Sequence, residues 1–379
     1  MNMRDFRVSV PTTLAFVVQG MCWGSFAALI PVLKSAIKAS DSQFGMALLL
    51  ATIGAVAAMW TAPIFERLLG RPVVAVLAAG LGVSFLLPGL AGGLGFFIFA
   101  MFLASVASGA LDVLMNARVS TMEAALKRSL MSYHHGMFSL AYAVSAFLTG
   151  LARAAGFSPF QIFLGVCVVA LVFAVFVLKP TPTASASASS APSNTHLGFG
   201  VFISGAIMLI AFMAEQSTEG WSALHLERTL GAGAVGGALG PTLLGGTMAL
   251  GRFSGQILAR FYAPLGISAI AAVVSASGAF IAALASSVSM AYVGFVILGL
   301  GVSVIVPMCF AIVGAMVSED ARTQAIARTA AFGYAGFFIG PPAMGFLSEW
   351  YGLSASFAFI GASLLLVPVL GLFLARRMK

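Results

Sequence analysis

The sequence has 379 residues, of which 60% are hydrophobic and only 8% are charged. Soluble proteins carry about a quarter charged residues, so this chain has too little polar surface for a water-soluble globule. The 19 basic and 11 acidic residues give a formal net charge of +8. The long runs without any charge exclude a soluble enzyme, a nucleic-acid-binding module and a disulfide-stapled secreted domain. The apolar runs are continuous and do not alternate with polar residues, which favours transmembrane helices over strands.

Apolar segments of membrane-spanning length follow one another along the whole chain. At about 30 residues for a span with its loop, the length predicts twelve transmembrane helices. The first follows Arg4 and Arg7 and has no obvious cleavage site, so we expect it to be retained. The fold class predicted is therefore an all-α integral membrane protein with two pseudo-symmetric six-helix bundles. The predicted spans are 12–34, 43–65, 72–92, 95–120, 130–153, 159–178, 198–221, 235–260, 265–286, 289–317, 325–348 and 354–375.

The segment between the sixth and seventh spans differs from its surroundings. It reads KPTPTASASASSAPSNTH, is rich in Ser, Ala, Thr and Pro, and has no helical face. This composition predicts a flexible linker at 179–196. The linker divides the chain into an N-terminal bundle, residues 1–178, and a C-terminal bundle, residues 197–379. Two six-helix halves are typical of secondary transporters.

The distribution of basic residues predicts the orientation in the membrane. If the N-terminus is cytoplasmic, the outer segments hold only Lys34, Lys38, Arg153 and Arg228. Arg252 lies inside the eighth span, and the remaining basic residues fall on the cytoplasmic side. Because cytoplasmic loops carry an excess of Lys and Arg, both termini and the linker are predicted to be cytoplasmic, in a bacterial inner membrane. The cytoplasmic basic residues are Arg4, Arg7, Arg67, Arg71, Arg118, Lys127, Arg128, Lys179, Arg260, Arg322, Arg328, Arg376, Arg377 and Lys379.

The chain contains no pattern that predicts a cofactor or metal. Cys22, Cys167 and Cys309 lie inside apolar runs without a CxxC pair, so we expect them to be packing residues. There is no Walker sequence, glycine-rich phosphate cradle or metal-spaced set of His and Cys. We therefore predict no cofactor, no metal, no enzymatic activity and no ATP-driven transport.

An acid interrupts the fourth span, which reads SGALDVLMNAR. Ionisable residues inside spans usually face a cavity or a partner. Asp112 and Asn116 are four residues apart and therefore share one helix face. A low-dielectric site disfavours the charged form of a carboxyl, so Asp112 is a candidate proton carrier and Asn116 a candidate substrate ligand. The alternative is a structural hydrogen bond to a neighbouring helix.

Two further acids lie in the seventh span, within FMAEQSTEGWSAL. Glu215 and Glu219 are four residues apart, and two close carboxylates share a proton readily. Both are candidates for proton coupling. Trp221, just beyond them, is either a substrate ligand or a residue of the interfacial aromatic belt.

Polar and aromatic residues in three other spans are candidate ligands. Gln19, Trp23 and Phe26 form one stripe on the first span, and an amide beside aromatic rings suits a sugar or polyol. His135, at the start of the fifth span, is a candidate proton relay to Asp112, ahead of its neighbour His134. Either His is otherwise an interfacial residue bonded to a backbone carbonyl. In the C-terminal half Tyr334 is the best candidate for a polar aromatic ligand. All of these aromatic residues also suit plain packing.

The loop after the second span, APIFERLLGRP at 62–72, resembles the signature loop G-x-L-a-D-R-x-G-R-R of the major facilitator superfamily. Glu66 stands for the usual Asp and is followed by Arg67 and Arg71. Two departures are an Ala in place of the leading Gly and one extra residue before the second Gly. The resemblance implies that this loop holds the cytoplasmic side closed through charge pairs. A second-half copy, GQILARF, keeps Arg260 but has Ala259 at the acidic place.

Further segments resemble one branch of the superfamily, the YbjJ-like and MosC-like rhizopine-transport proteins, with the fucose permeases as more distant relatives. In fucose permeases a span-four acid, followed four residues later by Asn, takes part in proton-linked sugar uptake, and Asp112 and Asn116 match that pattern. Their acid in the first span has no counterpart here. The segments are WGSF at 23–26, LDVLMNA at 111–117, SYHHGMFSL at 132–140, EGWSA at 219–223, GRFSG at 251–255 and GYAGFFIGPP at 333–342.

The sequence therefore predicts a monomeric, proton-coupled secondary transporter that moves a small polar solute by alternating access. A sugar, polyol or inositol derivative such as a rhizopine is the leading class, and its partners are the solute, protons and the lipid bilayer. The alternative is proton-driven efflux of amphipathic drugs or metabolites, which 32 Phe and 18 Met residues allow. A sensor or assembly role has no soluble domain in the sequence to support it.

Overall fold

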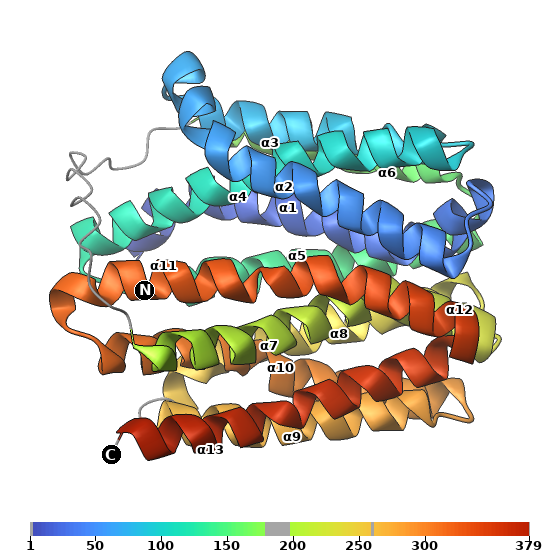
Figure 1. The fold of residues 1–379 in the computed structure, drawn as a ribbon. Coiled ribbons are helices and arrows are strands. Elements are labelled where there is room, and N and C mark those ends of the chain that lie inside the picture. The colour runs from blue at the N-terminus through green and yellow to red at the C-terminus, as the bar shows by residue number, and fades with distance from the viewer. Residues whose placement is uncertain (1–2, 179–197, 259–260, 379) are drawn as a thin grey trace.

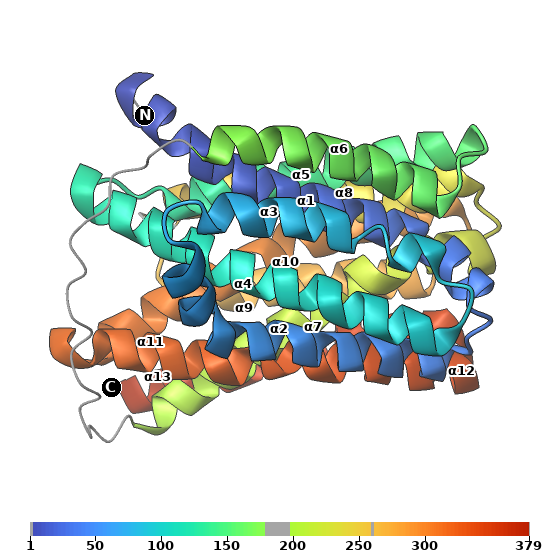
Figure 2. The same ribbon diagram turned by 90° about the horizontal axis from the view of Figure 1, so that it is seen from above.

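The computed structural model describes residues 3–178, 198–258 and 261–378. In these residues the regular secondary structure is helical throughout, and the helices lie side by side in one elongated bundle (Figure 1). The predicted linker at 179–196 and Arg260 lie outside the described residues. The ends of the described chain, at Met3 and Met378, lie at the same end of the bundle (Figures 1 and 2). We call this the terminal end and the opposite one the distal end.

The described part of the N-terminal half contains six apolar α-helical segments of a length that suits a bilayer. The third is short and continues into a 3-10 turn at Pro88–Leu90. The capping boxes Ser40/Gln43 and Ser158/Gln161 fix the starts of the second and sixth helices. The helices are α1 (Met3–Ala36), α2 (Asp41–Leu69), α3 (Val73–Ser84), α4 (Leu94–Leu126), α5 (Met131–Ala154) and α6 (Pro159–Val177).

The C-terminal half supplies the other six predicted spans from seven helices. After its first helix the backbone widens into a π-helical turn, His225–Thr229, at the distal end. The helices are α7 (Phe199–Leu224), α8 (Ala234–Leu258), α9 (Pro264–Ala283), α10 (Val288–Met316), α11 (Glu319–Gly333), α12 (Ala335–Leu364) and α13 (Leu366–Met378).

The helix α12 contains the turn between the last two spans. Gly352 has a φ of 84°, which glycine adopts without the steric cost borne by other residues. The chain reverses there, and α13 runs back toward the terminal end (Figure 1). Ten segments are long and apolar enough to cross a membrane, and one of them, 324–376, includes this turn and so holds two spans. With α8 the total is twelve, which confirms the predicted fold class.

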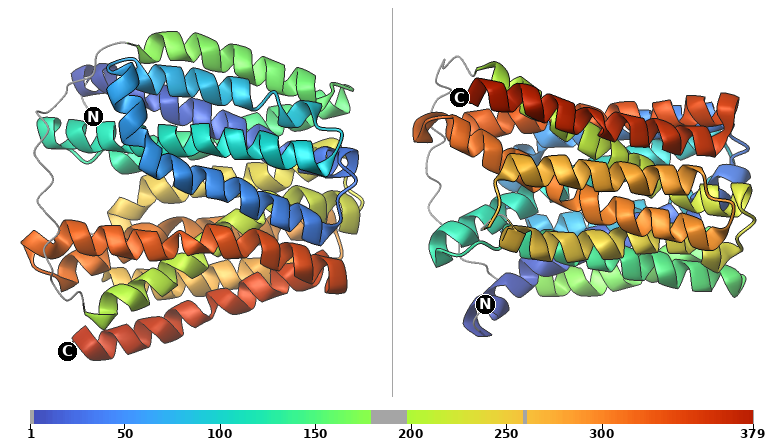
Figure 3. Two further views of the ribbon diagram at one scale, coloured as in Figure 1. Left: turned by 45° about the horizontal axis from the view of Figure 1, so that its top comes forward. Right: turned by 90° about the horizontal axis from the view of Figure 1, so that it is seen from below.

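The two halves meet mainly along two helix pairs, α5 with α8 and α2 with α12, and α1 also contacts α7 and α8. Small residues make the second contact close, as is common between membrane helices. A Cβ added to Gly345 of α12 would lie only 3.2 Å from the Cα of Gly45 on α2. On the terminal side of that contact, α2 and α4 diverge from α11 (Figure 3). The contact between α2 and α12 is therefore confined to the distal part of the bundle.

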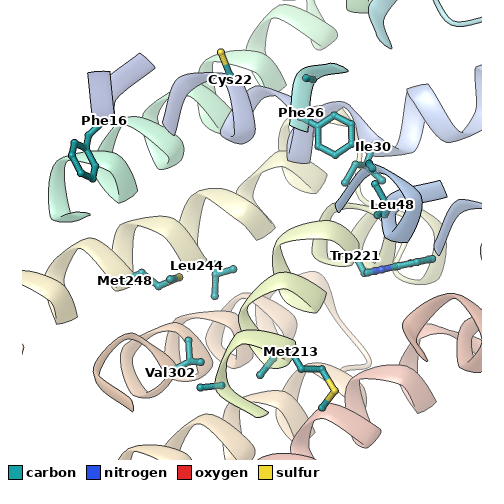
Figure 4. Packing of buried hydrophobic residues seen from close by; sticks show 14 of the residues in the cluster. Phe16, Cys22, Phe26, Ile30, Leu48, Met213, Trp221, Leu244, Met248 and Val302 are labelled. Carbon is teal, nitrogen blue, oxygen red and sulfur yellow. The ribbon is translucent and has the colours of Figure 1, made fainter. Parts of the chain in front are cut away.

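Buried apolar side chains form one continuous cluster that crosses from one half to the other. Phe16 and Phe26 on α1, and Met213 and Trp221 on α7, belong to it (Figure 4). Large apolar side chains are also exposed around the outside, as expected for helices that face lipid. The buried polar residues are mostly Ser and Thr, and the ionisable ones among the described residues are Asp41, His134, Glu215 and His225.

We expect Gly24→Ala to destabilise the contact between α1 and α5. A Cβ at Gly24 would overlap the backbone carbonyl of Tyr142, which has no side-chain freedom to move away. Overpacking of this kind costs about 1–3 kcal/mol, so the melting temperature in detergent should fall. Gly80→Ala is the matched control, since a Cβ there meets nothing within 4 Å. Equal melting temperatures for the two variants would contradict the expectation.

Candidate functional site

A chain of polar side chains crosses the interior of the N-terminal half, from the middle of α1 and α4 to the start of α5. Gln19 Nε2 of α1 donates to Asp112 Oδ1 of α4 at 3.4 Å. Asn116 Nδ2 donates to the same oxygen at 3.1 Å and to the Asp112 carbonyl at 2.8 Å. Asn116 Oδ1 lies 3.1 Å from His135 Nε2 of α5. The structure thus brings Gln19 to the three residues that the sequence already linked, Asp112, Asn116 and His135.

This arrangement follows from helix periodicity. Asp112 and Asn116 are one turn apart on α4, and Ser108 lies one turn before them on the same face. Trp23, one turn after Gln19 on α1, donates its indole N–H to Ser108 Oγ at 2.9 Å. Two side-chain hydrogen bonds, from Gln19 to Asp112 and from Trp23 to Ser108, therefore connect α1 with α4. Gln19 Oε1 is buried and has no hydrogen-bond partner in the described residues.

The other predicted aromatic ligands have different surroundings. Phe26 is 4% exposed and stacks with Phe97 at a centroid distance of 6.5 Å. Trp221 is fully buried and contacts Phe44 edge-on at 5.8 Å. The structure does not bring these two residues to the Asp112 chain. Tyr334 is nearer to it: the side chain is partly exposed and interacts electrostatically with Asp112.

A second polar cluster lies where α7 and α8 of the C-terminal half meet α5 of the N-terminal half. Arg252 Nη2 pairs with Glu215 Oε1 at 2.8 Å, and Arg252 Nη1 donates to Ser139 Oγ. Glu219 interacts electrostatically with both Glu215 and Arg252. Arg252 also interacts electrostatically with His135, which connects the cluster to the Asp112 chain.

Three charged groups meet at the distal end around Asp41, the first residue of α2. Arg228 of the π-helical turn donates to both carboxylate oxygens, at 2.7 and 2.6 Å. Lys34 pairs with Asp41 at 2.8 Å, and Ser348 of α12 also donates to it. Nearby, the Ser42 backbone N–H donates to a Glu349 carboxylate oxygen at 2.8 Å. These contacts join the two halves.

A second ion pair closes the same end, and here the N-terminal half supplies the basic residue and the C-terminal half the acidic one. Arg153 at the end of α5 donates to both carboxylate oxygens of Glu227, at 2.7 and 2.9 Å, and to the Ala28 carbonyl at 2.6 Å. Glu227 and Arg228 are neighbours in the π-helical turn, a rare conformation that often marks functional sites. One turn therefore contacts two separate anchors on the N-terminal half. We call the Asp41–Arg228 and Arg153–Glu227 pairs together the distal latch.

The predicted gating loop lies at the terminal end. Glu66, Arg67 and Arg71 are exposed, and the Arg71 carbonyl accepts a hydrogen bond from Arg118 of α4 at 2.9 Å. Within the described part of the chain, none of the three forms an ion pair. Arg260, their predicted counterpart, lies outside the described residues.

Sequence reasoning missed several residues of these clusters. Arg252 was visible as a lone basic residue in an apolar span, and that signal alone marks a functional candidate. Ser139 and Tyr142 gave no signal, because Ser and Tyr are ordinary in membrane helices. The residues of the distal latch were visible only as loop charges.

Comparisons with known proteins agree with this fold. Residues 265–379 match the family model described as Major Facilitator Superfamily. An uncharacterized MFS-type transporter from Yersinia pestis is 29% identical over 94% of this chain and 93% of its own length. The membrane protein MosC from Rhizobium meliloti is 26% identical over 95% of this chain and 88% of its own.

Solved structures show the same fold at lower sequence identity. The D-xylose–proton symporter superposes with a TM-score of 0.79 and 16% identity, over 97% of each chain. A bacterial homolog of the human lysosomal transporter Spinster, in its inward-facing and occupied conformation, has a TM-score of 0.75 and 13% identity, over 99% of this chain and 97% of that one. The chain is therefore similar over nearly its whole length to MFS-type membrane proteins, and it shares the fold of the solved transporters.

Proposed function

We propose that the protein is a proton-coupled secondary transporter that moves a small polar solute by alternating access. The observation that carries this proposal is the partly buried carboxyl of Asp112, held by Gln19 and Asn116 in the interior of the bundle. A carboxyl at that depth is costly unless it has a function or a charged partner. In the described residues Asp112 has hydrogen-bonding partners but no basic residue within ion-pair distance. A proton is therefore the natural ligand that neutralises it.

The distal latch supports alternating access as the mechanism. Both pairs cross between the halves, and both must break if the halves separate at that end. With the terminal end cytoplasmic, as the basic residues predict, the latch lies on the periplasmic side of a bacterial inner membrane. The conformation described here is then closed to the periplasm. Transport requires the latch to open while the terminal end closes.

The chemistry of the interior favours a hydroxylated solute as cargo. Gln19 Oε1 is a buried acceptor without a partner, Asn116 and His135 offer further polar atoms, and Trp23 supplies a ring beside them. Amide groups bind hydroxyls and rings bind the C–H face of a sugar. A sugar, polyol or inositol derivative fits this set, bound by a monomer without a cofactor.

One cluster favours the alternative cargo, an amphipathic compound exported in exchange for protons. Phe212, Tyr334 and Phe337 form a stack, with Phe212 4.6 Å from Phe337 and 5.4 Å from Tyr334 between ring centroids. Such a stack offers a flat apolar surface near Asp112. The two readings predict opposite directions of transport with respect to the proton gradient.

The test is uptake into proteoliposomes under an imposed proton gradient. Labelled sugars, polyols, inositols and amphipathic dyes are offered at equal concentration, with the gradient directed inward and then outward. Accumulation that follows the inward proton gradient supports symport, and accumulation against it supports efflux. If no compound responds to the gradient although labelled solute exchanges across the membrane, proton coupling is wrong. In the matched control, an ionophore collapses the proton gradient and uptake is measured again.

A further inference from the structure

Arg252 binds both halves of the protein at the same time. Its Nη2 pairs with Glu215 of α7 at 2.8 Å, in its own half, and its Nη1 donates to Ser139 of α5 in the other half. The side chains of Arg252 and Glu215 are 15% and 11% exposed. Among the four ion pairs of the described residues, this is the one that lies in the interior and away from the distal end.

A second acceptor for Arg252 lies one helical turn away. Glu219 follows Glu215 on the same face of α7, about 6 Å farther toward the distal end. Glu219 interacts electrostatically with Arg252 and Glu215 but accepts no hydrogen bond from any described residue. Tyr142 of α5 interacts electrostatically with both glutamates, and its hydroxyl is also without a partner. One guanidinium therefore has two carboxyls within reach and pairs with one.

The contact to Ser139 ties this pairing to the position of the halves. The helices α5 and α8 lie along each other across the boundary between the halves. If α5 moves relative to α8, the hydrogen bond from Arg252 to Ser139 breaks and frees donors of the guanidinium. A buried carboxylate without a partner is strongly disfavoured. The carboxyl that Arg252 leaves must then take up a proton, and the carboxyl that it joins must release one.

We propose that Arg252 is a positioning residue that transfers from Glu215 to Glu219 when the halves reorient. In the conformation described here Glu215 is ionised and paired, and Glu219 holds the proton. After the transfer Glu219 is ionised and paired, and the proton that it has released is held by Glu215, one helical turn away. The groups that face this exchange are Tyr142 and His135 of α5, besides the two glutamates. The inference rests on the proposed function as a proton-coupled transporter.

Infrared spectroscopy of the purified protein tests the location of the proton directly. The carbonyl stretch of a protonated carboxyl is separate from the bands of a carboxylate, so each glutamate can be followed. For the wild type we expect a protonated-carboxyl band that disappears in Glu219→Gln. In Arg252→Gln we expect an additional protonated-carboxyl band, because Glu215 has lost its counter-ion, and this band should disappear in the double variant with Glu215→Gln.

Two further variants separate a positioning role from a structural one. Arg252→Lys keeps the positive charge and should restore the wild-type spectrum, even if exchange is slower. Ser254→Ala is the control on α8, since Ser254 is exposed and bonds only the Leu250 and Gly251 carbonyls of its own helix. A spectrum of folded Arg252→Gln without an additional band would overturn the proposal. So would a wild-type spectrum from which Glu219→Gln removes no protonated-carboxyl band.

The spectra and the uptake assay fail independently. If uptake is proton-coupled and depends on Asp112 but the Glu219 band is absent, only the role of Arg252 is wrong. If the bands respond as expected but no solute follows the proton gradient, the coupled-transport proposal is wrong and the exchange of Arg252 between carboxyls has no transport to serve.

Discussion

Asp112→Asn is expected to abolish proton-driven accumulation while leaving exchange of solute across the membrane intact. The asparagine has almost the same shape as the aspartate, and its Oδ1 can still accept from Gln19 and Asn116. It cannot bind and release a proton. A variant that binds solute but carries no proton equilibrates its cargo, so the ratio of internal to external solute should fall to about one.

The measurement compares two assays on the same proteoliposomes. Net uptake under an inward proton gradient reports coupling, and exchange against unlabelled internal solute reports binding and reorientation. Retained exchange is the internal control for folding. Accumulation equal to that of the wild type would remove Asp112 from proton coupling and leave the Glu215, Glu219 and Arg252 cluster as the remaining candidate.

The residues of the central site could be predicted from the sequence in part. Asp112 was detectable because a carboxyl in an apolar span is rare, and Asn116 because helix periodicity places it on the same face. The twelve spans followed from hydropathy alone. What the sequence could not give was the contacts between helices: nothing in α1 indicates that Gln19 reaches Asp112, and His135 contacts Asn116 rather than Asp112 itself.

Aromatic residues were the least predictable candidates. Phe26 and Trp221 have the composition of ligands, but the structure buries both among other rings. A stripe on one helix face indicates burial and does not say whether that face meets a neighbouring helix or a solute. The sequence did not predict the distal latch either, because its partners Asp41 and Arg228 are 187 positions apart and only the fold brings them together.

The second large effect is expected from Glu227→Gln, which removes the charge on one side of the distal latch. Arg153 is only 7% exposed, and without the Glu227 carboxylate its remaining described acceptor is the Ala28 carbonyl. Removing Arg228 is milder, because its side chain is 42% exposed and Lys34 still pairs with Asp41. The variant that leaves a buried cation unpaired should therefore disturb the closed distal end more.

The expected size follows from the bonds that are lost. A hydrogen bond to a charged group contributes about 1.5–3 kcal/mol, and about 1.4 kcal/mol corresponds to a tenfold change in an equilibrium constant. Glu227→Gln should therefore lower the ratio of distally closed to distally open molecules by about tenfold or more. Arg228→Gln should lower it less, and the double variant should lower it furthest.

Pulsed electron–electron double resonance, which measures distances between two spin labels, can quantify the distally closed and distally open populations. Spin labels at Phe157 and Ser286, which are exposed on opposite halves at the distal end, report its opening. Cys22, Cys167 and Cys309 are buried, so labelling is directed to the introduced cysteines. Lys38→Gln is the matched control, since it removes an exposed charge at the same end without breaking a pair between the halves. A distance distribution that is the same in Glu227→Gln and Lys38→Gln would show that the latch does not hold the halves together. A long-distance population that grows from Lys38→Gln to Arg228→Gln to Glu227→Gln would instead place the energy of distal closure in the buried Arg153–Glu227 pair.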